Sequence, residues 1–215
     1  MAIAQVQTSV LGAGTTPVTS SFPATPTEGN LLVCYADGST VIANASIANG
    51  WTFIQSAKPG TNPTCSLWYK VAGAAESKDV TVTWTGSTET RVKAWEYSGF
   101  VAPILDKSAK QDGGGTPVTS RSSGTTDTTT VADELCIACF KGGIQVSAES
   151  WSNSFATLWK NAASWDRIVG ALVTVSSGAK ETTISWTTSS TMGGIIATFM
   201  STPTTAWIPK VIMVM

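Results

Sequence analysis

Short stretches in which apolar and polar side chains alternate account for most of this chain. In Val80–Trp84 every second residue is apolar, so one face of a strand would be apolar and the other would carry threonine. Such stretches recur at intervals of roughly 8–12 residues, with Gly, Pro and Asn between them, and no helical period appears. The pattern predicts strands near Ile3–Val10, Pro17–Phe22, Leu31–Ala36, Trp51–Ala57, Ser66–Ala72, Val80–Trp84, Arg91–Tyr97, Leu105–Lys110, Val118–Ser122, Leu135–Phe140, Ser154–Lys160, Ile168–Val175, Thr182–Trp186 and Gly194–Met200.

The chain also repeats parts of its own sequence after roughly one hundred residues. The pairs that carry the repeat are Thr16–Ser20 with Thr116–Ser120, Trp51 with Trp151, Leu31–Val33 with Leu135–Ile137, and Val80–Trp84 with Glu181–Trp186. A fixed period with a small drift indicates two copies of one β unit, residues 1–99 and 100–200. The echoed tryptophans are predicted to anchor the two cores: Trp51, Trp84, Trp151 and Trp186.

Many short strands with glycine-rich turns indicate an all-β protein. They predict a β-sandwich of the jelly-roll or concanavalin-like kind, built from two sequence-related halves. The joint between the halves, Ser98–Leu105, is short and apolar, whereas a flexible linker is polar. We therefore expect residues 1–200 to form a single domain with an internal repeat. The alternative is two tandem seven-stranded sandwiches.

Composition narrows the classes of function. Charged residues make up 13% of the chain, about half the usual share, so the surface is expected to be polar without being charged. The net charge is −1 and the cations are scattered, which argues against nucleic acid as a partner. There is no histidine, the commonest general base and transition-metal ligand.

Targeting signals are not evident in the sequence. The first residues have neither the basic region nor the apolar core of a secretory signal, and no run approaches the roughly eighteen apolar residues of a membrane span. We expect the protein to be made in a cytoplasm, with no membrane as partner, and to stay soluble or join an assembly.

Four cysteines are present: Cys34, Cys65, Cys136 and Cys139. Cys136 and Cys139 are spaced like a metal or redox pair, but residues three apart in a strand point to opposite faces and could not share one ion. We expect all four to be buried and reduced, as free cysteines usually are. A disulfide between Cys34 and Cys65 is the alternative.

Carboxylates are the remaining candidates for acid–base chemistry. Only Glu96 lies within a predicted strand between aromatic residues, Trp95 and Tyr97. A glycosidase needs two carboxylates that face each other in a cleft, so we interpret Glu96 as a solvated or paired strand charge. The sequence has no nucleophile elbow, phosphate loop or dinucleotide fingerprint. We therefore predict no catalytic, cofactor-binding or metal-binding residue.

Nine tryptophans are the richest signal left. Aromatic rows on a sandwich face can stack on sugars, and several tryptophans have no echo in the other half. Among these, the candidates for glycan or interface contacts are Trp68, Trp95 and Trp165.

Residues 201–215 differ from everything before them. The run Ala206–Met215 carries one charge in ten residues, at a position where chains are usually polar. It is either an extra strand that completes a sheet edge, or an apolar C-terminal arm that docks on a neighbouring subunit. The residues expected to make that interface are Trp207, Ile208, Val211, Ile212, Met213, Val214 and Met215.

Several motifs together resemble a family of tailed-phage and prophage proteins. They are Glu28–Val33, Asn49–Thr52, Trp68–Glu76, Val82–Ser87 and Trp95–Gly99, followed by an apolar strand, Ile195–Phe199. The progression in the family is GNLLV, GW, YYKVAGASE, FTWSG and EYSGV, and the resemblance covers residues 16 to 200. Proteins of this family are similar to jelly-roll or lectin-like sandwiches encoded among virion genes. These motifs are structural, so the resemblance implies no catalytic residue.

The resemblance implies a non-enzymatic protein of the virion. The favoured form is a head decoration, or cement, protein that binds the major capsid protein as a homo-oligomer, with a trimer favoured, because repeated weak contacts on a lattice add by avidity. One alternative is a tail, neck or fibre component that binds other virion subunits. Another is a carbohydrate-binding module for host glycans, and a glycosidase comes last.

Overall fold

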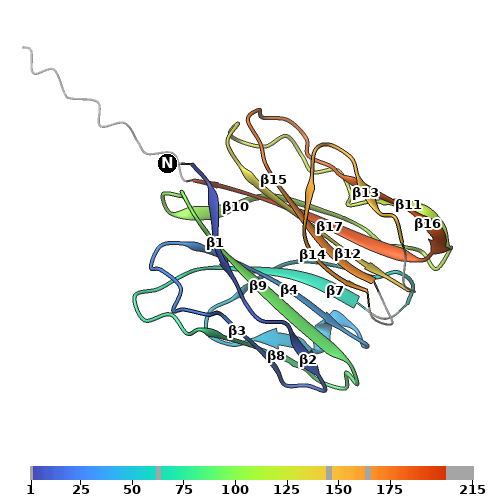
Figure 1. Ribbon diagram of the computed structural model, residues 1–215, viewed down its shortest axis with the longest axis horizontal. Helices are drawn as coiled ribbons and strands as arrows, with labels where there is room; N and C mark the ends of the chain where they lie inside the picture. Colours follow the sequence, from blue (N-terminus) through green and yellow to red (C-terminus); the bar gives the residue numbers. More distant parts are fainter. Residues whose placement is uncertain (1, 62–63, 144–146, 163–165, 202–215) are drawn as a thin grey trace, which may run out of the picture.

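The computed structural model describes residues 2–61, 64–143, 147–162 and 166–201, and in these residues the chain is an all-β protein (Figure 1). Seventeen strands and one short 3₁₀ helix, η1 (Ile42–Asn44), are present there. Each of the predicted strands is found, with ends that differ by a few residues. Three short strands were not anticipated: β2 (Gly12–Gly14), β5 (Ala45–Ile47) and β13 (Ser150–Trp151). The prediction of an all-β sandwich is confirmed.

The first half of the chain forms two antiparallel sheets. The first large sheet has the order β1-β9-β4-β7-β6, with β2 also paired to β9, and the first small sheet has the order β3-β8-β5. Their remaining strands are β1 (Ala4–Thr8), β3 (Val18–Ser21), β4 (Leu31–Gly38), β6 (Thr52–Ala57), β7 (Thr64–Val71), β8 (Asp79–Trp84) and β9 (Thr90–Ser98).

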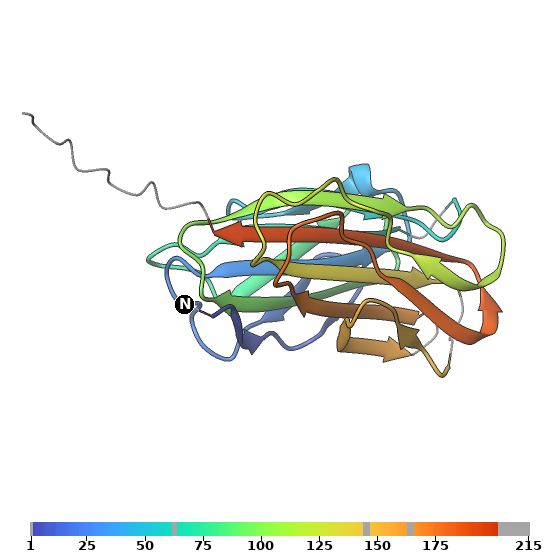
Figure 2. The same cartoon turned by 90° about the horizontal axis from the view of Figure 1, so that it is seen from above.

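The second half forms two sheets with the same pattern of strands. The second large sheet has the order β10-β17-β12-β15-β14, and the second small sheet has the order β11-β16-β13. Figure 2 shows the strands of this large sheet side by side along the length of the molecule. Their bounds are β10 (Pro103–Gln111), β11 (Val118–Ser122), β12 (Leu135–Gly142), β14 (Ala156–Ala162), β15 (Asp166–Val173), β16 (Thr183–Ser190) and β17 (Met192–Ser201).

The four sheets are stacked as layers, with an apolar core between each pair of neighbours. In each half a small sheet covers the outer face of a large sheet, over cores that contain Trp84 in the first half and Trp186 in the second. The inner faces of the two large sheets meet over a central core that contains Tyr35, Trp95 and Phe199. Each half is thus a two-layer unit, as in the tandem alternative, but the two units share a core.

Strands β4 and β12 lie at the centre of this stack and are buried along their whole length. Alternate residues of β4 enter different cores: Val33 faces the central core and Cys34 faces the outer core of the first half. A strand that is covered on both faces needs an unbroken apolar run, which explains why these two segments do not alternate.

The structure sorts the sequence echoes into those that hold corresponding places and those that do not. Leu31 and Leu135 each begin the central strand of a large sheet, and Trp84 and Trp186 each lie in an outer core. Trp51, in contrast, directly precedes β6, whereas Trp151 lies in β13; the residue that directly precedes β14 is Phe155. The prediction that Trp51 and Trp151 are equivalent anchors is therefore wrong, although both pack against outer cores.

The repeated Thr-Pro-Val-Thr-Ser segment is also out of register. Val18 pairs with Val82 in β8, but Val118 pairs with Ser190, at the far end of β16. Threonine and serine suit any exposed strand, so their recurrence carries little positional information. The echoes that hold corresponding places are those buried on both sides or in a core.

The Asp37-Gly38 and Lys141-Gly142 pairs have residue types that are typical of turns, but they form the ends of β4 and β12. A Cβ on Gly38 would lie 2.5 Å from the Trp84 ring, so this glycine allows close approach rather than a turn. The two charged residues are buried because they bind each other, as described below.

Candidate functional site

The tryptophans proposed to contact glycans are core residues where the structure describes them. Trp95 is buried in the central core, and Trp68 is buried in the outer core of the first half, where its Nε1 donates to Ser66 Oγ at 2.9 Å. A stacking platform must be exposed, so the prediction for Trp68 and Trp95 is wrong. Trp165 lies outside the described residues, as do the predicted interface residues between Trp207 and Met215.

The cysteines are buried and free, as predicted. Cys136 faces the outer core of the second half and Cys139 faces the central core, so the two thiols lie on opposite faces of β12. Cys34 and Cys65 are likewise divided between two cores. Burial raises the pKa of Cys136 to about 12, which leaves little thiolate for nucleophilic or metal chemistry.

A buried cluster of charged side chains joins the two halves, and we call it the ion cluster. It consists of Asp37 on β4, Lys141 on β12 and Arg167 on β15. Asp37 accepts from Lys141 Nζ through Oδ1 at 2.7 Å and from Arg167 Nε through Oδ2 at 2.6 Å. All three side chains are at most 2% exposed. Tyr35 also donates to Asp37, and Glu89, which is 35% exposed, accepts from Arg167.

Electrostatics hold the ion cluster in its charged form. Burial alone would raise the pKa of Asp37, but the charges and hydrogen bonds of Lys141 and Arg167 outweigh it and lower that pKa. Burial and the negative charge of Asp37 raise the pKa of Tyr35, so this phenol remains a donor. The ion cluster is enclosed between the two large sheets. It links the first half to the second through ion pairs.

Sequence reasoning missed the ion cluster, although a signal was available. Asp37-Gly38 and Lys141-Gly142 are 104 residues apart, as are the starts of the buried strands that contain them. Two corresponding positions with opposite charge, each at the end of an apolar run, indicate a pair that meets between the two copies. No spacing in the sequence points to Arg167. It lies on β15, and only the fold shows that β15 pairs with β12 and so brings Arg167 beside Lys141.

A second polar cluster anchors the first half beside the edge strand β1. The Glu96 carboxylate is buried and accepts from Gln7 Nε2, from the Thr27 amide at 2.8 Å and from Asn30 Nδ2 at 2.5 Å. These contacts tie β1 and the segment before β4 to β9. Glu96 is therefore a paired strand charge, as one of the two sequence interpretations had it.

The corresponding corner of the second half holds two carboxylates, Asp106 and Glu134. Glu134 directly precedes β12, as Asn30 directly precedes β4, and Asp106 lies at an irregularity in the pairing of β10 with β17. Asp106 accepts from the Thr130 amide at 2.7 Å and from Lys107 Nζ at 2.9 Å. Glu134 is fully buried, and its Oε2 has no hydrogen-bond donor.

The two carboxyl groups differ in proton affinity. Burial works to raise the pKa of Asp106, but hydrogen bonds from Thr130 and Lys107 prevail and lower it to about 2. Burial and the neighbouring Asp106 raise the pKa of Glu134. A proton on Glu134 can then be donated to Asp106. This pair resembles an acid–base dyad in chemistry, but its position matches the Glu96 anchor of the first half, which favours a structural role.

The raised pKa of Glu134 predicts an unusual stability change. The folded protein holds the carboxyl proton of Glu134 more tightly than the unfolded chain does. The contribution of this group to folding stability is therefore complete below the ordinary pKa of 4.5, and it is lost as pH rises through the raised pKa. Glu134→Gln, which carries a permanent donor, should melt roughly 2–4 °C higher than the parent at pH 7, as expected for about 1 kcal/mol. The gain should shrink below pH 4.5.

The matched control is Glu96→Gln in the first half. Here a carboxylate with three donors is replaced by an amide with one acceptor, so the melting temperature should fall instead. Thermal melts from pH 4 to 8 compare both variants with the parent. A loss of stability in Glu134→Gln at pH 7 would contradict the raised pKa of Glu134.

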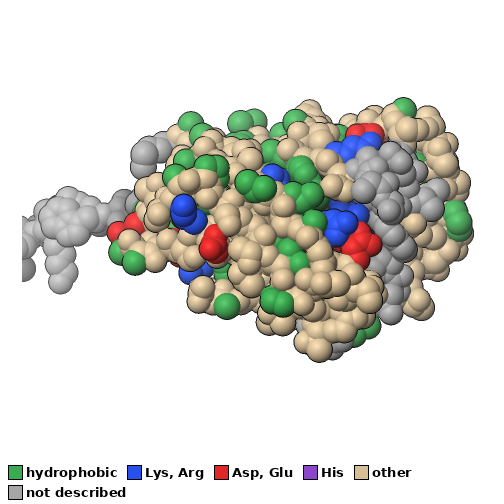
Figure 3. Space-filling model, turned by 60° about the horizontal axis from the view of Figure 1, so that its bottom comes forward, with side chains coloured by type: hydrophobic (Ala, Val, Ile, Leu, Met, Phe, Trp, Pro, Cys, Tyr) green, Lys and Arg blue, Asp and Glu red, His purple; other side chains and the backbone are tan. Residues whose placement is uncertain are grey.

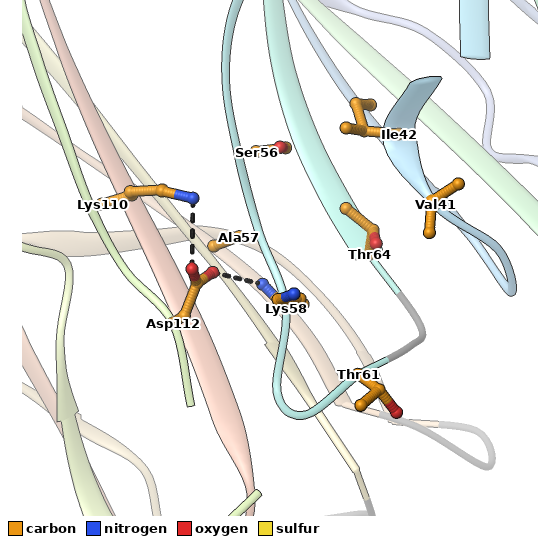
Figure 4. A pocket seen from close by; sticks show the side chains of 9 residues that line it. All are labelled: Val41, Ile42, Ser56, Ala57, Lys58, Thr61, Thr64, Lys110 and Asp112. Carbon is orange, nitrogen blue, oxygen red and sulfur yellow. Dashed lines mark hydrogen bonds and ion pairs between the residues drawn. The ribbon is translucent and has the colours of Figure 1, made fainter. Parts of the chain in front are cut away.

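A hollow of about 220 Å³ opens where β6 of the first half lies over β10 of the second (Figure 4). Figure 4 shows Asp112 facing Lys110 and the backbone of Lys58, with Val41 and Ile42 on the other side. Asp112 accepts from the Lys58 amide at 3.0 Å and from Lys110 Nζ at 3.1 Å. Asp112 thus fixes the turn after β6 against the end of β10, which is a structural role.

The outer surface matches the charge-poor composition. The face in Figure 3 is mostly uncharged, with hydrophobic side chains in separate small areas and few charged groups. Within the described residues, no three metal-binding side chains converge, and no helix has the length and apolar character to cross a membrane. Comparisons of the chain with protein-family models, curated proteins and solved structures find no match.

Proposed function

We propose that this chain is a non-enzymatic structural protein of a tailed-phage particle, with head decoration as its role. The observation that carries the proposal is the set of motifs between residues 16 and 200 that resembles phage virion proteins. Their roles in the fold are consistent with a purely structural family. Gly29, at φ 82°, turns the chain into β4, and Asn30 binds Glu96. Gly99, at φ 93°, leaves no room for a Cβ beside Ala2.

The layered body supports a scaffolding role. The central core and the ion cluster hold the halves together, so a load on one half is carried by the other. The surface offers uncharged polar groups, which are less costly to bury against a capsid than charges are. In this proposal the apolar segment 206–215 provides the attachment to the major capsid protein, and a trimer closes the assembly.

The test is incorporation into particles. Phage are grown with a gene that encodes either the full chain or residues 1–205, and purified particles are analysed by mass spectrometry and electron microscopy. We expect the full chain at lattice positions of the head, and at least a tenfold loss of incorporation for residues 1–205. The truncated chain should melt at the same temperature as the full chain, which separates lost docking from misfolding.

The alternative virion location gives a different image. If the protein occupies the tail, neck or fibre, the density will lie there and its copy number will be far below that of the capsid protein. Particles that carry the truncated chain in normal amounts would overturn the role of residues 206–215. A full-length protein that is absent from particles would overturn the proposal as a whole.

A further inference from the structure

Both halves of the molecule have a surface hollow at corresponding places. The first hollow, beside the end of β7, and the second hollow, beside the end of β15, each measure about 420 Å³. Val71 and Val173 end these strands and pair with the residues that begin β4 and β12. Each hollow is also lined by an asparagine with left-handed backbone, Asn49 at φ 67° and Asn153 at φ 55°.

The two hollows differ in chemistry. The first is lined by Lys70, which pairs with Glu76 at 2.9 Å and donates to the Asn49 carbonyl at 2.5 Å. By register, Leu172 stands in the second hollow where Lys70 stands in the first. Likewise Val175, two residues after β15, stands where Gly73 follows β7.

The second hollow therefore presents apolar surface to solvent. Val173 is 45% exposed and Val175 is 85% exposed, and Leu172 and Phe155 also line the hollow. Apolar area that is left in water forgoes about 25 cal/mol for each Å². Two neighbouring exposed valines over a hollow are the kind of surface that a partner covers.

We propose that the second hollow is the docking site for the apolar segment 206–215 of the same chain while the protein is free. This inference rests on the proposed function in one respect: the same segment is later used to attach the protein to the capsid. Docking in the free protein would shield an apolar segment, and exposed apolar segments are an aggregation hazard.

The position of Ser201 favours an occupant from the same chain. Ser201 ends β17, at the same end of the second large sheet as Val173. Phe199 pairs with Leu135, which pairs with Val173, so two strand spacings, about 10 Å, separate β17 from the hollow. The five residue steps from Ser201 to Ala206 span up to about 17 Å, which is enough to reach it.

Composition also fits this occupant. Trp207, Ile208 and Val211 supply apolar side chains, and Lys210 is the single charge of the segment. The lining of the hollow carries both Lys180 and Glu181, and Glu181 has the charge opposite to that of Lys210. The first hollow, in contrast, has no apolar side chain larger than that of Ala75 in its lining, so it offers the same segment little apolar contact.

Hydrogen exchange of the isolated protein tests the inference. Backbone amides of residues 172–181 should exchange at least tenfold more slowly in the full chain than in residues 1–205, whereas those of residues 70–79, at the first hollow, should not change. The full-length variant Val175→Ser should lose this protection, because it removes exposed apolar area without touching a core. The matched control, Val71→Thr beside the first hollow, should keep it.

Equal exchange at residues 172–181 in the full and truncated chains would overturn the inference. Protection that grows with protein concentration would assign the occupant to a second copy and would also overturn docking within one chain. The proposed function fails separately: Val175→Ser keeps residues 206–215 and should still enter particles, whereas the truncated chain should not.

Discussion

Replacing Asp37 with alanine is expected to lower the free energy of unfolding by about 3–5 kcal/mol, the usual result of breaking a buried ion pair by removing one partner. Lys141 Nζ and Arg167 Nε both donate to this carboxylate, and both side chains are at most 2% exposed. Without Asp37, two buried cations would lose the carboxylate that they share. Urea unfolding followed by tryptophan fluorescence measures the change.

Two further variants make this prediction specific. Glu89→Gln should cost less than about 1 kcal/mol, because Glu89 is 35% exposed and solvent screens its charge. The triple variant Asp37→Leu, Lys141→Met and Arg167→Met removes all three buried charges and should recover most of the stability lost in Asp37→Ala. If Asp37→Ala unfolds at the same urea concentration as the parent, the ion cluster does not hold the halves together.

The pH dependence of the parent follows from the same cluster. The pKa of Asp37 is lowered in the folded protein, so its contribution to stability is present above the ordinary value of 3.8 and is lost as pH falls through the lowered one. The free energy of unfolding should therefore fall as the pH drops below 3.8, which urea unfolding at a series of pH values measures.

The ion cluster also explains which surfaces meet. Asp37 and Lys141 hold corresponding positions on β4 and β12, so two copies of the same half would bring like charges together in the central core. Like charges in a buried interface cost several kcal/mol. The opposite charges therefore favour pairing of a first half with a second half over pairing of two identical halves.

Gly170→Ala is expected to cost about 1–3 kcal/mol, as overpacking of a core usually does. A Cβ at residue 170 would lie 2.7 Å from the ring of Trp151. That ring cannot easily move, because its Nε1 donates to Thr157 at 2.8 Å and the ring stacks on Phe155. Thermal unfolding by circular dichroism measures the loss.

The first half indicates how the loss can be reversed. There Trp68 occupies the β7 position that corresponds to Gly170, and the small first sheet carries Ile47 on β5, the counterpart of β13. Trp151→Ile should therefore relieve Gly170→Ala, so that the double variant is more stable than the sum of the two single changes predicts. Additive losses would mean that the two residues do not compete for the same space.

The sequence alone determined the fold class and the strands, because alternation and turn residues are local signals. Val80–Trp84 and Leu31–Ala36 were both recognised as strands without any knowledge of their neighbours, and both are strands in the structure. The opposite directions of Cys136 and Cys139 also follow from strand geometry alone. The apolar joint at Ser98–Leu105 predicted one body, and residues of both halves line the central core.

Tertiary structure alone decided which residues are neighbours across the layers. Trp68 and Trp95 could not be recognised as core residues from the sequence. The sequence pattern around a tryptophan in a strand is the same whether or not a second sheet covers that face of the strand. Trp51 and Trp151 are one repeat period apart in the sequence, but they occupy different positions in the two halves. The pairing of strands, rather than the sequence spacing, sets these positions. Asp37, Lys141 and Arg167 come together from three strands of two halves, and only packing of the large sheets makes their burial tolerable. Local patterns fix what each strand is, whereas the charges that a strand can bury depend on what lies opposite.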